Sequence, residues 1–511
     1  MGAGTANLNG IHNYLYLKKG NLIECRLLAF SARAIVAYLP DYLLMSSPLS
    51  NNLASQERRA GISLALIYAF RMLGLFMILP VFALYAEHFP GATPLMMGLA
   101  LGIYGLTQAL LQIPFGMWSD RIGRKPVIFI GLLIFAVGSL IAGSATTIEG
   151  IIVGRAIQGG GAIASALMAL AADLSREEHR TKMMAFIGVS IGVSFAASMV
   201  LGPVVNDLVG ISGIFFSTAA LALVGIAILY FFVPDPVHSY FHRDAEVETQ
   251  SLLSVLKDTQ LLRLDIGIFS LHFILMCIFL VMPLILHDDF AVAADDHWQI
   301  YLPVFMASLV IMVPFIIIAE RKRAMKPVFI GAIISLVIAT SVFLSSHSLF
   351  SLVLGLVIFF AGFNLLEASL PSLITKTAPA TQKGTAMGMY SSSQFLGAFA
   401  GGAAGGYAHQ SWGIPGVFYT ALMVLVFWLL LALTMKKPGY LSTYLLNVRD
   451  VTVEQLLAVE GVVEAALVDE ERVVDRGDEK AAENRPLTVA YLKVKKRILD
   501  EEKLLSLAAS D

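Results

Sequence analysis

One acid, three bases and two glycines are concentrated in residues 116–125, which read GMWSDRIGRK. The stretch separates two strongly apolar segments, 94–115 and 126–142. Placing charges this close to hydrocarbon costs free energy, and such charges usually have a function. An arginine can fork between two carboxylates, which a lysine does less well. We therefore predict a conformational latch, not bond-making chemistry, formed by Gly116, Asp120, Arg121, Gly123, Arg124, Lys125 and Asp173.

Five further polar residues interrupt apolar segments and are candidates for proton coupling or transport: Arg71, Arg155, His272, Asn364 and Glu367. An isolated carboxyl such as that of Glu367 can take up and release a proton in a low-dielectric environment. Structural roles compete with each assignment. Arg155 could pair permanently with Gln108 or Gln112, Glu367 could belong to a fixed salt bridge, and His272 could serve helix packing.

Composition excludes several classes of protein. Hydrophobic residues make up 57% of the 511-residue chain, well above the fraction in soluble proteins. The net charge of −2 says nothing about partners, but no stretch of the sequence reads as a nucleic-acid-binding patch, so no nucleic-acid partner is expected. The two cysteines, Cys25 and Cys277, form no metal motif or disulfide framework, so neither metal nor cofactor is expected. No catalytic Ser/His/Asp constellation is present, and we expect no enzyme.

Apolar segments of about 20 residues predict membrane helices. Twelve such segments predict an all-α membrane protein with two six-helix halves. They cover residues 61–86, 94–115, 126–145, 148–172, 182–205, 212–233, 263–286, 299–318, 327–345, 349–374, 384–408 and 414–435.

Lysine and arginine predict the topology, because loops on the cytoplasmic side carry an excess of them. The turns after the second, fourth, eighth and tenth segments hold Arg121, Arg124, Lys125, Arg176, Arg180, Lys182, Arg321, Lys322, Arg323, Lys326, Lys376 and Lys383. The opposite turns hold no lysine or arginine. Both termini are therefore expected in the cytoplasm.

An internal repeat supports the division into halves. The triplet Lys125-Pro126-Val127 recurs as Lys326-Pro327-Val328, 201 residues later, although Asp120 then falls on Arg321. We expect an N-terminal half over 60–233, a cytoplasmic linker over 234–260 and a C-terminal half over 261–437.

The two ends of the chain differ from the apolar body. Residues 1–59 are expected to be a disordered extension, because charges and prolines interrupt their one partly apolar stretch. A third of residues 438–511 are charged, which predicts a separate soluble region. Its strands (441–448, 462–468 and 487–494) and helices (452–459 and 497–507) follow the order βαββα. This order suggests a small ferredoxin-like unit without a clear final strand.

The pattern of residues 116–125 strongly resembles the loop motif of the major facilitator superfamily of secondary transporters. Several blocks are similar to its YajR-type inner-membrane transporters of Gram-negative bacteria, including Gln112-Ile-Pro-Phe-Gly116, Asn364-Leu-Leu-Glu367, Gly384-Thr-Ala-Met-Gly388 and Ser393-Gln-Phe-Leu-Gly397. The resemblance covers residues 60–437 and implies that Asp120 lies beside the start of the eleventh helix, near Gly384 and Thr385. It also implies proton coupling at Arg155.

The resemblance implies a monomeric carrier of the bacterial inner membrane that exports small amphipathic molecules against a proton gradient. The family's antiporter motif in the fifth segment is only partly present. Gly202-Pro203 is kept, but Ser198 stands where glycine is expected and Asn206-Asp207 replaces the final glycine pair. A facilitator, an importer of another solute and a membrane sensor that uses the tail therefore remain alternatives.

Overall fold

The computed structural model describes residues 51–175, 177–235, 252–379, 382–436, 442–448, 451–470, 487–495 and 498–507. It divides into two compact units, Met1–Gln56 and Glu57–Asp511. Of the first unit only residues 51–56 are described, and they begin the first helix. Of the extension expected over 1–59, residues 1–50 lie outside the described residues, as does most of the linker expected over 234–260, whereas residues 51–59 are helical.

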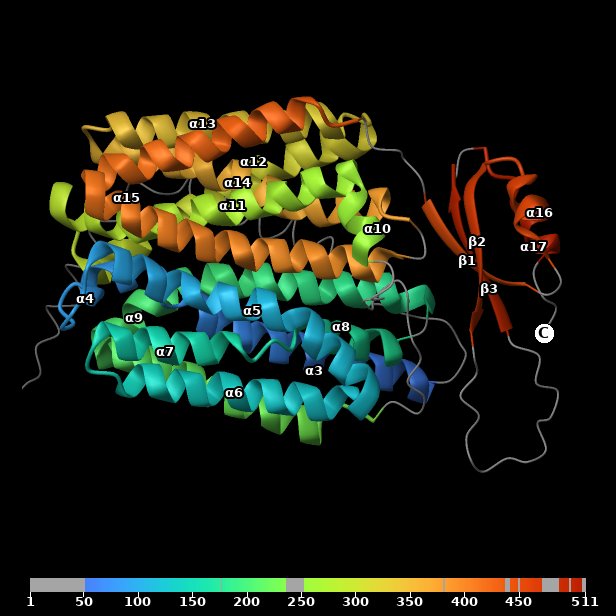
Figure 1. The fold of residues 1–511 in the computed structure, drawn as a ribbon, viewed down its shortest axis with the longest axis horizontal. Coiled ribbons are helices and arrows are strands. Elements are labelled where there is room, and N and C mark those ends of the chain that lie inside the picture. The colour runs from blue at the N-terminus through green and yellow to red at the C-terminus, as the bar shows by residue number, and fades with distance from the viewer. Residues whose placement is uncertain are drawn as a thin grey trace, which may run out of the picture. The chain divides into compact units, whose positions relative to one another are not determined.

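Helices make up the body of the second unit (Figure 1). In chain order they are α3 (Asn51–Phe76), α4 (Phe82–Ala86), α5 (Pro94–Ile122), α6 (Arg124–Ser144), α7 (Ile148–Gly159), α8 (Ala164–Asp173), α9 (Glu177–Phe231), α10 (Leu252–Lys257), α11 (Thr259–Leu284), the π-helical η2 (Ile285–Asp289), the 3-10 helix η3 (Ala294–Asp296), α12 (His297–Arg321), α13 (Met325–Ser345), α14 (Leu349–Thr377) and α15 (Lys383–Leu433).

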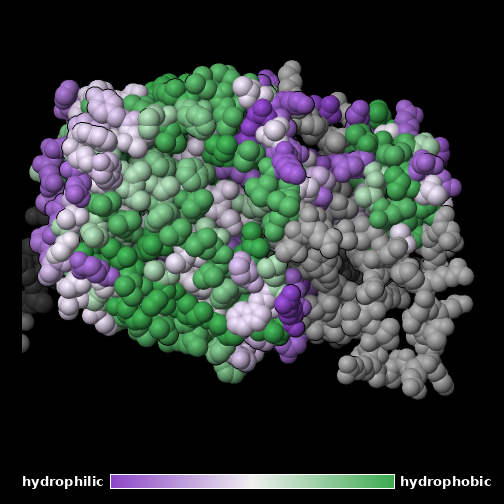
Figure 2. Space-filling view, in the orientation of Figure 1, coloured by the Kyte–Doolittle hydropathy of each residue, from purple (hydrophilic) through white to green (hydrophobic). Residues whose placement is uncertain are grey.

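Ten helices in the described part are long and apolar enough to cross a membrane. Figure 2 shows a broad apolar surface across the middle of the helical body, with polar surface toward its ends. Large apolar side chains such as those of Val189, Leu223 and Phe427 are exposed on the helical body. Lipid covers such surface in a membrane protein, so these helices form a multi-pass membrane protein.

Two of the ten helices are twice as long as a single crossing requires. Helix α9 has 55 residues and α15 has 51, and each contains one non-helical glycine, Gly210 (φ 69°) and Gly413 (φ 68°). These glycines lie within the turns expected over 206–211 and 409–413, each of which is reduced to a kink between two helices. Glycine adopts positive φ without the steric penalty of a side chain, so one residue is enough to redirect the helix.

The two halves of the bundle repeat one capping contact. Lys125 Nζ donates to the main-chain oxygen of Val233 at 2.7 Å, and Lys326 Nζ donates to that of Leu433 at 2.9 Å. Each lysine begins the third helix of its half and reaches the end of the last one. A cation at a helix C-terminus is favourable because the terminal carbonyls carry partial negative charge.

Glycines bring the halves into close contact along α5 and α15. A Cβ built on Gly98 would stand 2.1 Å from the main-chain oxygen of Gly402, and one on Gly105 would stand 2.4 Å from that of Phe395. Small residues let helix backbones approach this closely. We call the bundle end that contains residues 116–125 the latch end and the opposite end, where α5 begins, the far end. Gly98 lies toward the far end, so the halves are packed together there.

The tail forms a three-stranded sheet from β1 (Ser442–Val448), β2 (Val462–Glu470) and β3 (Leu487–Val494) in the order β1-β3-β2. Both outer strands run antiparallel to β3, with α16 (Val453–Leu457) between β1 and β2. The expected order βαββα is present, since α17 (Glu501–Ser506) follows. Tyr444 donates to Glu501 at 2.7 Å, and this hydrogen bond raises the pKa of the phenol.

Candidate functional site

The charged turn between α5 and α6 consists of one residue. Helix α5 ends at Ile122 and α6 begins at Arg124, and Gly123 between them has φ +99°. Only glycine adopts this conformation without strain. Nearly two turns before the end of α5, Gly116 lies against α8, since a Cβ on it would stand 3.0 Å from Ser165 Oγ. The two glycines of the motif thus permit the tight turn and the close helix contact that position Arg124.

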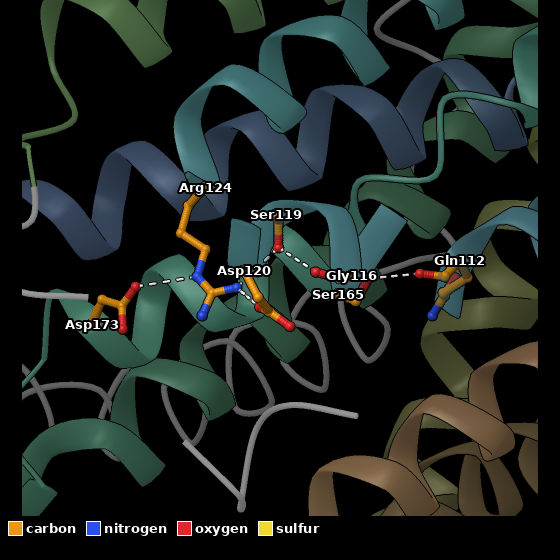
Figure 3. A network of polar contacts seen from close by, with 7 residues as sticks. All are labelled: Gln112, Gly116, Ser119, Asp120, Arg124, Ser165 and Asp173. Atoms are coloured by element: carbon orange, nitrogen blue, oxygen red, sulfur yellow. Dashed lines mark hydrogen bonds and ion pairs between the residues drawn. The ribbon is translucent and has the colours of Figure 1, made fainter. Parts of the chain in front are cut away.

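Arg124 is the centre of the polar network in Figure 3. Its guanidinium forms an ion pair with Asp120 one turn earlier and donates from Nε to Asp173 Oδ2 at 3.3 Å. It also donates to Ser119 Oγ at 2.9 Å. The Arg124 side chain is 2% exposed and that of Asp173 is fully buried. One forked cation therefore joins the end of α5, the start of α6 and the end of α8, as the residue types predict.

The other two bases of the motif lie away from this network. Arg121 is exposed. Lys125 forms a 2.6 Å ion pair with Asp235, beyond the end of α9. Asp120, Arg124 and Asp173 thus make the inner contact, while Lys125 ties α6 to α9.

The contact with the eleventh helix remains a prediction. Gly384 and Thr385 are buried in the first turn of α15. The contacts of Arg124 with Ser119, Asp120 and Asp173 all lie within the N-terminal half. The network therefore braces three helices of one half, and its effect on the other half requires a test.

Arg71 lies in a buried polar cluster of the N-terminal half. One of its terminal nitrogens donates to Tyr104 Oη at 2.7 Å, to Gln108 Oε1 at 2.6 Å and to the main-chain oxygen of Gly161 at 3.1 Å. Its Nε and Nη1 are buried and have no hydrogen-bond partner among the residues that the structure describes. A buried charge without a counter-ion is costly, so this arginine is a strong candidate for a role in function.

Arg155 is held mainly by backbone. It donates to the main-chain oxygens of Ala100 and Leu101, each at 3.0 Å, and to Gln158 Oε1 at 3.1 Å. The pairing with Gln108 or Gln112 that was the structural alternative is not formed, because Gln108 contacts Arg71 and donates to Gln112. Among the ion pairs of the described residues, none joins a carboxylate to Arg71 or Arg155.

In the C-terminal half, Glu367 and His272 lie together. Glu367 Oε2 stands 3.9 Å from His272 Nε2 and has no hydrogen-bond partner in the described part of the chain. Gln394 joins the two, with its Nε2 3.1 Å from Glu367 Oε1 and 2.9 Å from His272 Nε2. The Glu367 side chain is 36% exposed. No lysine or arginine of the described residues pairs with it, in contrast to the fixed salt bridge that was the alternative.

Asn364 has a different partner, although it is one turn before Glu367 on α14. It donates to Ser308 Oγ of α12 at 2.9 Å.

Sequence reasoning missed Tyr104 and Gln394, whose only signal was polarity inside apolar segments. It also missed Asp265, which is 5% exposed on α11 and whose Oδ1 has no hydrogen-bond partner in the described ranges. The described residues contain no group of three or more His, Cys, Asp or Glu side chains that could hold a metal ion.

The comparisons with known proteins agree on one protein family. The Major Facilitator Superfamily model matches residues 64–398 and 321–445. The inner membrane transport protein YajR of Escherichia coli (strain K12) is 46% identical over 422 residues, which cover 81% of this chain and 93% of that protein.

More distant relatives agree. Multidrug resistance protein 2 of Bacillus subtilis (strain 168) is 27% identical over 359 residues, or 65% of this chain and 84% of that protein. The solved structure of the human organic anion transporter MFSD10 is 18% identical and has a TM-score of 0.55, and the match covers 74% of this chain and 99% of that one. At this identity the last comparison shows the fold alone.

Proposed function

Because the chain belongs to the major facilitator superfamily and is a membrane transporter, we propose that it exports small amphipathic molecules in exchange for protons. The observation that carries the proposal is the carboxyl of Glu367, which belongs to a side chain that is 36% exposed and has no lysine or arginine partner among the described residues. Such a carboxyl can change its protonation state without breaking a fixed salt bridge. The relative named multidrug resistance protein 2 supports export as the direction.

We further propose twelve crossings in two six-helix halves, with α9 and α15 each contributing two on either side of Gly210 and Gly413. The placement of lysine and arginine supports cytoplasmic termini, and the YajR relative supports the bacterial inner membrane. Alternating access then requires the two halves to rock about a central site. In this scheme the residues for proton coupling or transport are Arg71 and Arg155 in the N-terminal half. In the C-terminal half they are Glu367, His272 and Asn364.

The test is proton movement in proteoliposomes with an imposed pH gradient and an enclosed pH-sensitive dye. Amphipathic cations such as ethidium and tetraphenylphosphonium, followed by neutral and anionic compounds, are added as substrates. We expect one class to move protons through the unmodified protein and Glu367→Gln to abolish that movement. The matched control is Glu320→Gln, because Glu320 is an exposed carboxyl that pairs with Lys376 at 2.8 Å.

Two outcomes contradict the proposal. Substrate-driven proton movement that is unchanged in Glu367→Gln would reject this residue as the proton carrier. Substrate flux that does not respond to the pH gradient in the unmodified protein would reject proton coupling and favour a facilitator.

A further inference from the structure

A cavity of about 430 Å³ opens on the side of the bundle between the start of α6 and the end of α9. Its walls are mainly apolar and include Pro126, Phe129, Ile130 and Tyr230. The rings of Phe129 and Tyr230 meet edge to face at 5.7 Å. Tyr230 is 66% exposed. Tyrosine on the surface near a helix end is typical of the boundary between lipid headgroups and acyl chains.

One cation and one anion also line the cavity. Lys125 and Asp235 pair at 2.6 Å, and the Asp235 side chain is 88% exposed. Lys125 donates in addition to the main-chain oxygen of Val233. A lysine ammonium has three N–H donors, so one remains beyond these two contacts. The cavity therefore offers a donor for a phosphate oxygen and, beside it, an exposed carboxylate for an ammonium group.

We propose that this cavity binds one zwitterionic phospholipid with a primary ammonium headgroup, such as a phosphatidylethanolamine. Its phosphate contacts Lys125, its ammonium contacts Asp235, and the upper part of an acyl chain packs against Phe129 and Ile130. Basic pockets between membrane helices commonly hold lipid headgroups. Asp235 repels a lipid with net negative charge, which distinguishes this site from a general attraction to anionic lipids.

The internal repeat provides a built-in comparison. Lys326 makes the same capping contact in the C-terminal half, but the chain continues there with Lys436 and Lys437 and has no acid at the position equivalent to Asp235. The paired charges are thus specific to the N-terminal half. This inference does not depend on what the protein transports or in which direction.

Native mass spectrometry of the full-length protein in detergent tests the site with palmitoyl-oleoyl phosphatidylethanolamine and phosphatidylglycerol at equal concentration. We expect at least threefold more ethanolamine-lipid adduct in the unmodified protein. Asp235→Asn should bring the two lipids to equal binding, and Ile130→Trp should reduce both by filling the cavity. Lys326→Gln is the matched control and should keep the preference.

Asp235 is exposed, so Asp235→Asn leaves the fold intact. This variant therefore tests the site even if Ile130→Trp disturbs the fold. Equal binding of both lipids to the unmodified protein would overturn the proposal. An ethanolamine-lipid preference that survives Asp235→Asn would do the same, because it would place the bound lipid elsewhere on the apolar belt.

Discussion

At the scale of single residues, Arg124 is the position on which the charged motif depends. Its side chain is buried and contacts Ser119, Asp120 and Asp173 on two helices other than its own. A guanidinium can make these contacts at once because its donors form a rigid fork, whereas an ammonium is a point charge. Removing the fork leaves the fully buried Asp173 with one contact fewer in a region of low dielectric.

Arg124→Lys should therefore lower stability by about 1.5–3 kcal/mol, the contribution of one hydrogen bond to a charged group. Thermal unfolding of the purified protein in detergent measures the change as a lower Tm. Arg121→Lys is the matched control, because Arg121 is exposed in the same motif. Equal Tm values for both variants would show that Arg124 contributes only positive charge.

Residue types alone predicted the pairing of Arg124 with Asp120 and Asp173, since few carboxylates lie near the ends of apolar segments. They did not predict the partners of Arg155, which are mostly main-chain oxygens. Main-chain carbonyls carry no sequence signal. The approach of Gln394 to Glu367 and His272 depends on the packing of three helices that are distant in sequence, which a single sequence does not encode locally.

At the scale of elements, glycines determine where helices bend and where they touch. Gly210 and Gly413 redirect two long helices, and Gly98, Gly105 and Gly402 bring α5 against α15. The apolar periodicity identified the helices and the tail strands well. It missed the break between α7 and α8, because apolar residues continue through residues 160–163. Hydropathy reports burial in lipid and is insensitive to such local backbone changes.

The close contact of α5 and α15 predicts a conformational variant. Gly98→Ala places a methyl group where the Gly402 carbonyl now stands, so α5 and α15 must separate. Native Cys277 is a suitable reporter, because it is buried on α11 and its thiol donates to the Gly401 oxygen of α15 at 3.4 Å. In a Cys25→Ser background, maleimide should label Cys277 several-fold faster in the variant.

The control for this experiment is Gly188→Ala on α9, where a Cβ meets no atom within 4 Å. Its labelling rate should equal that of the unmodified protein. If Gly98→Ala also leaves the rate unchanged, the contact between α5 and α15 does not restrict access to this part of the bundle.

At the scale of the whole molecule, charged groups inside the bundle are divided by sign between the halves. The N-terminal half holds Arg71 and Arg155, and the C-terminal half holds Asp265 and Glu367. None of these four groups pairs with an oppositely charged lysine, arginine, aspartate or glutamate among the described residues. Protonation of Glu367 would reduce the attraction between the halves, which links proton binding to their relative motion in the proposed cycle.

Phenylalanine rings lie where the halves meet. Phe195 of α9 contacts Phe305 of α12 and Phe279 of α11, with ring centroids 5.5 and 6.3 Å apart. This cluster and the glycine contacts of α5 hold the halves together away from the latch end.

The central claim is that the two ends of the bundle open in alternation. The Asp120–Arg124–Asp173 network determines the relative populations of the two open arrangements. Spin-label distance measurements in a cysteine-free background test it directly. One pair, Arg121→Cys with Lys322→Cys, reports the latch end. A second pair, Glu149→Cys with His347→Cys, reports the far end. All four positions are exposed.

Asp120→Asn weakens the network at its one partly exposed acid. The account predicts a larger population of long distances for the latch-end pair and, in the same variant, more short distances for the far-end pair. Unchanged distributions, or a widening at both ends together, would contradict it.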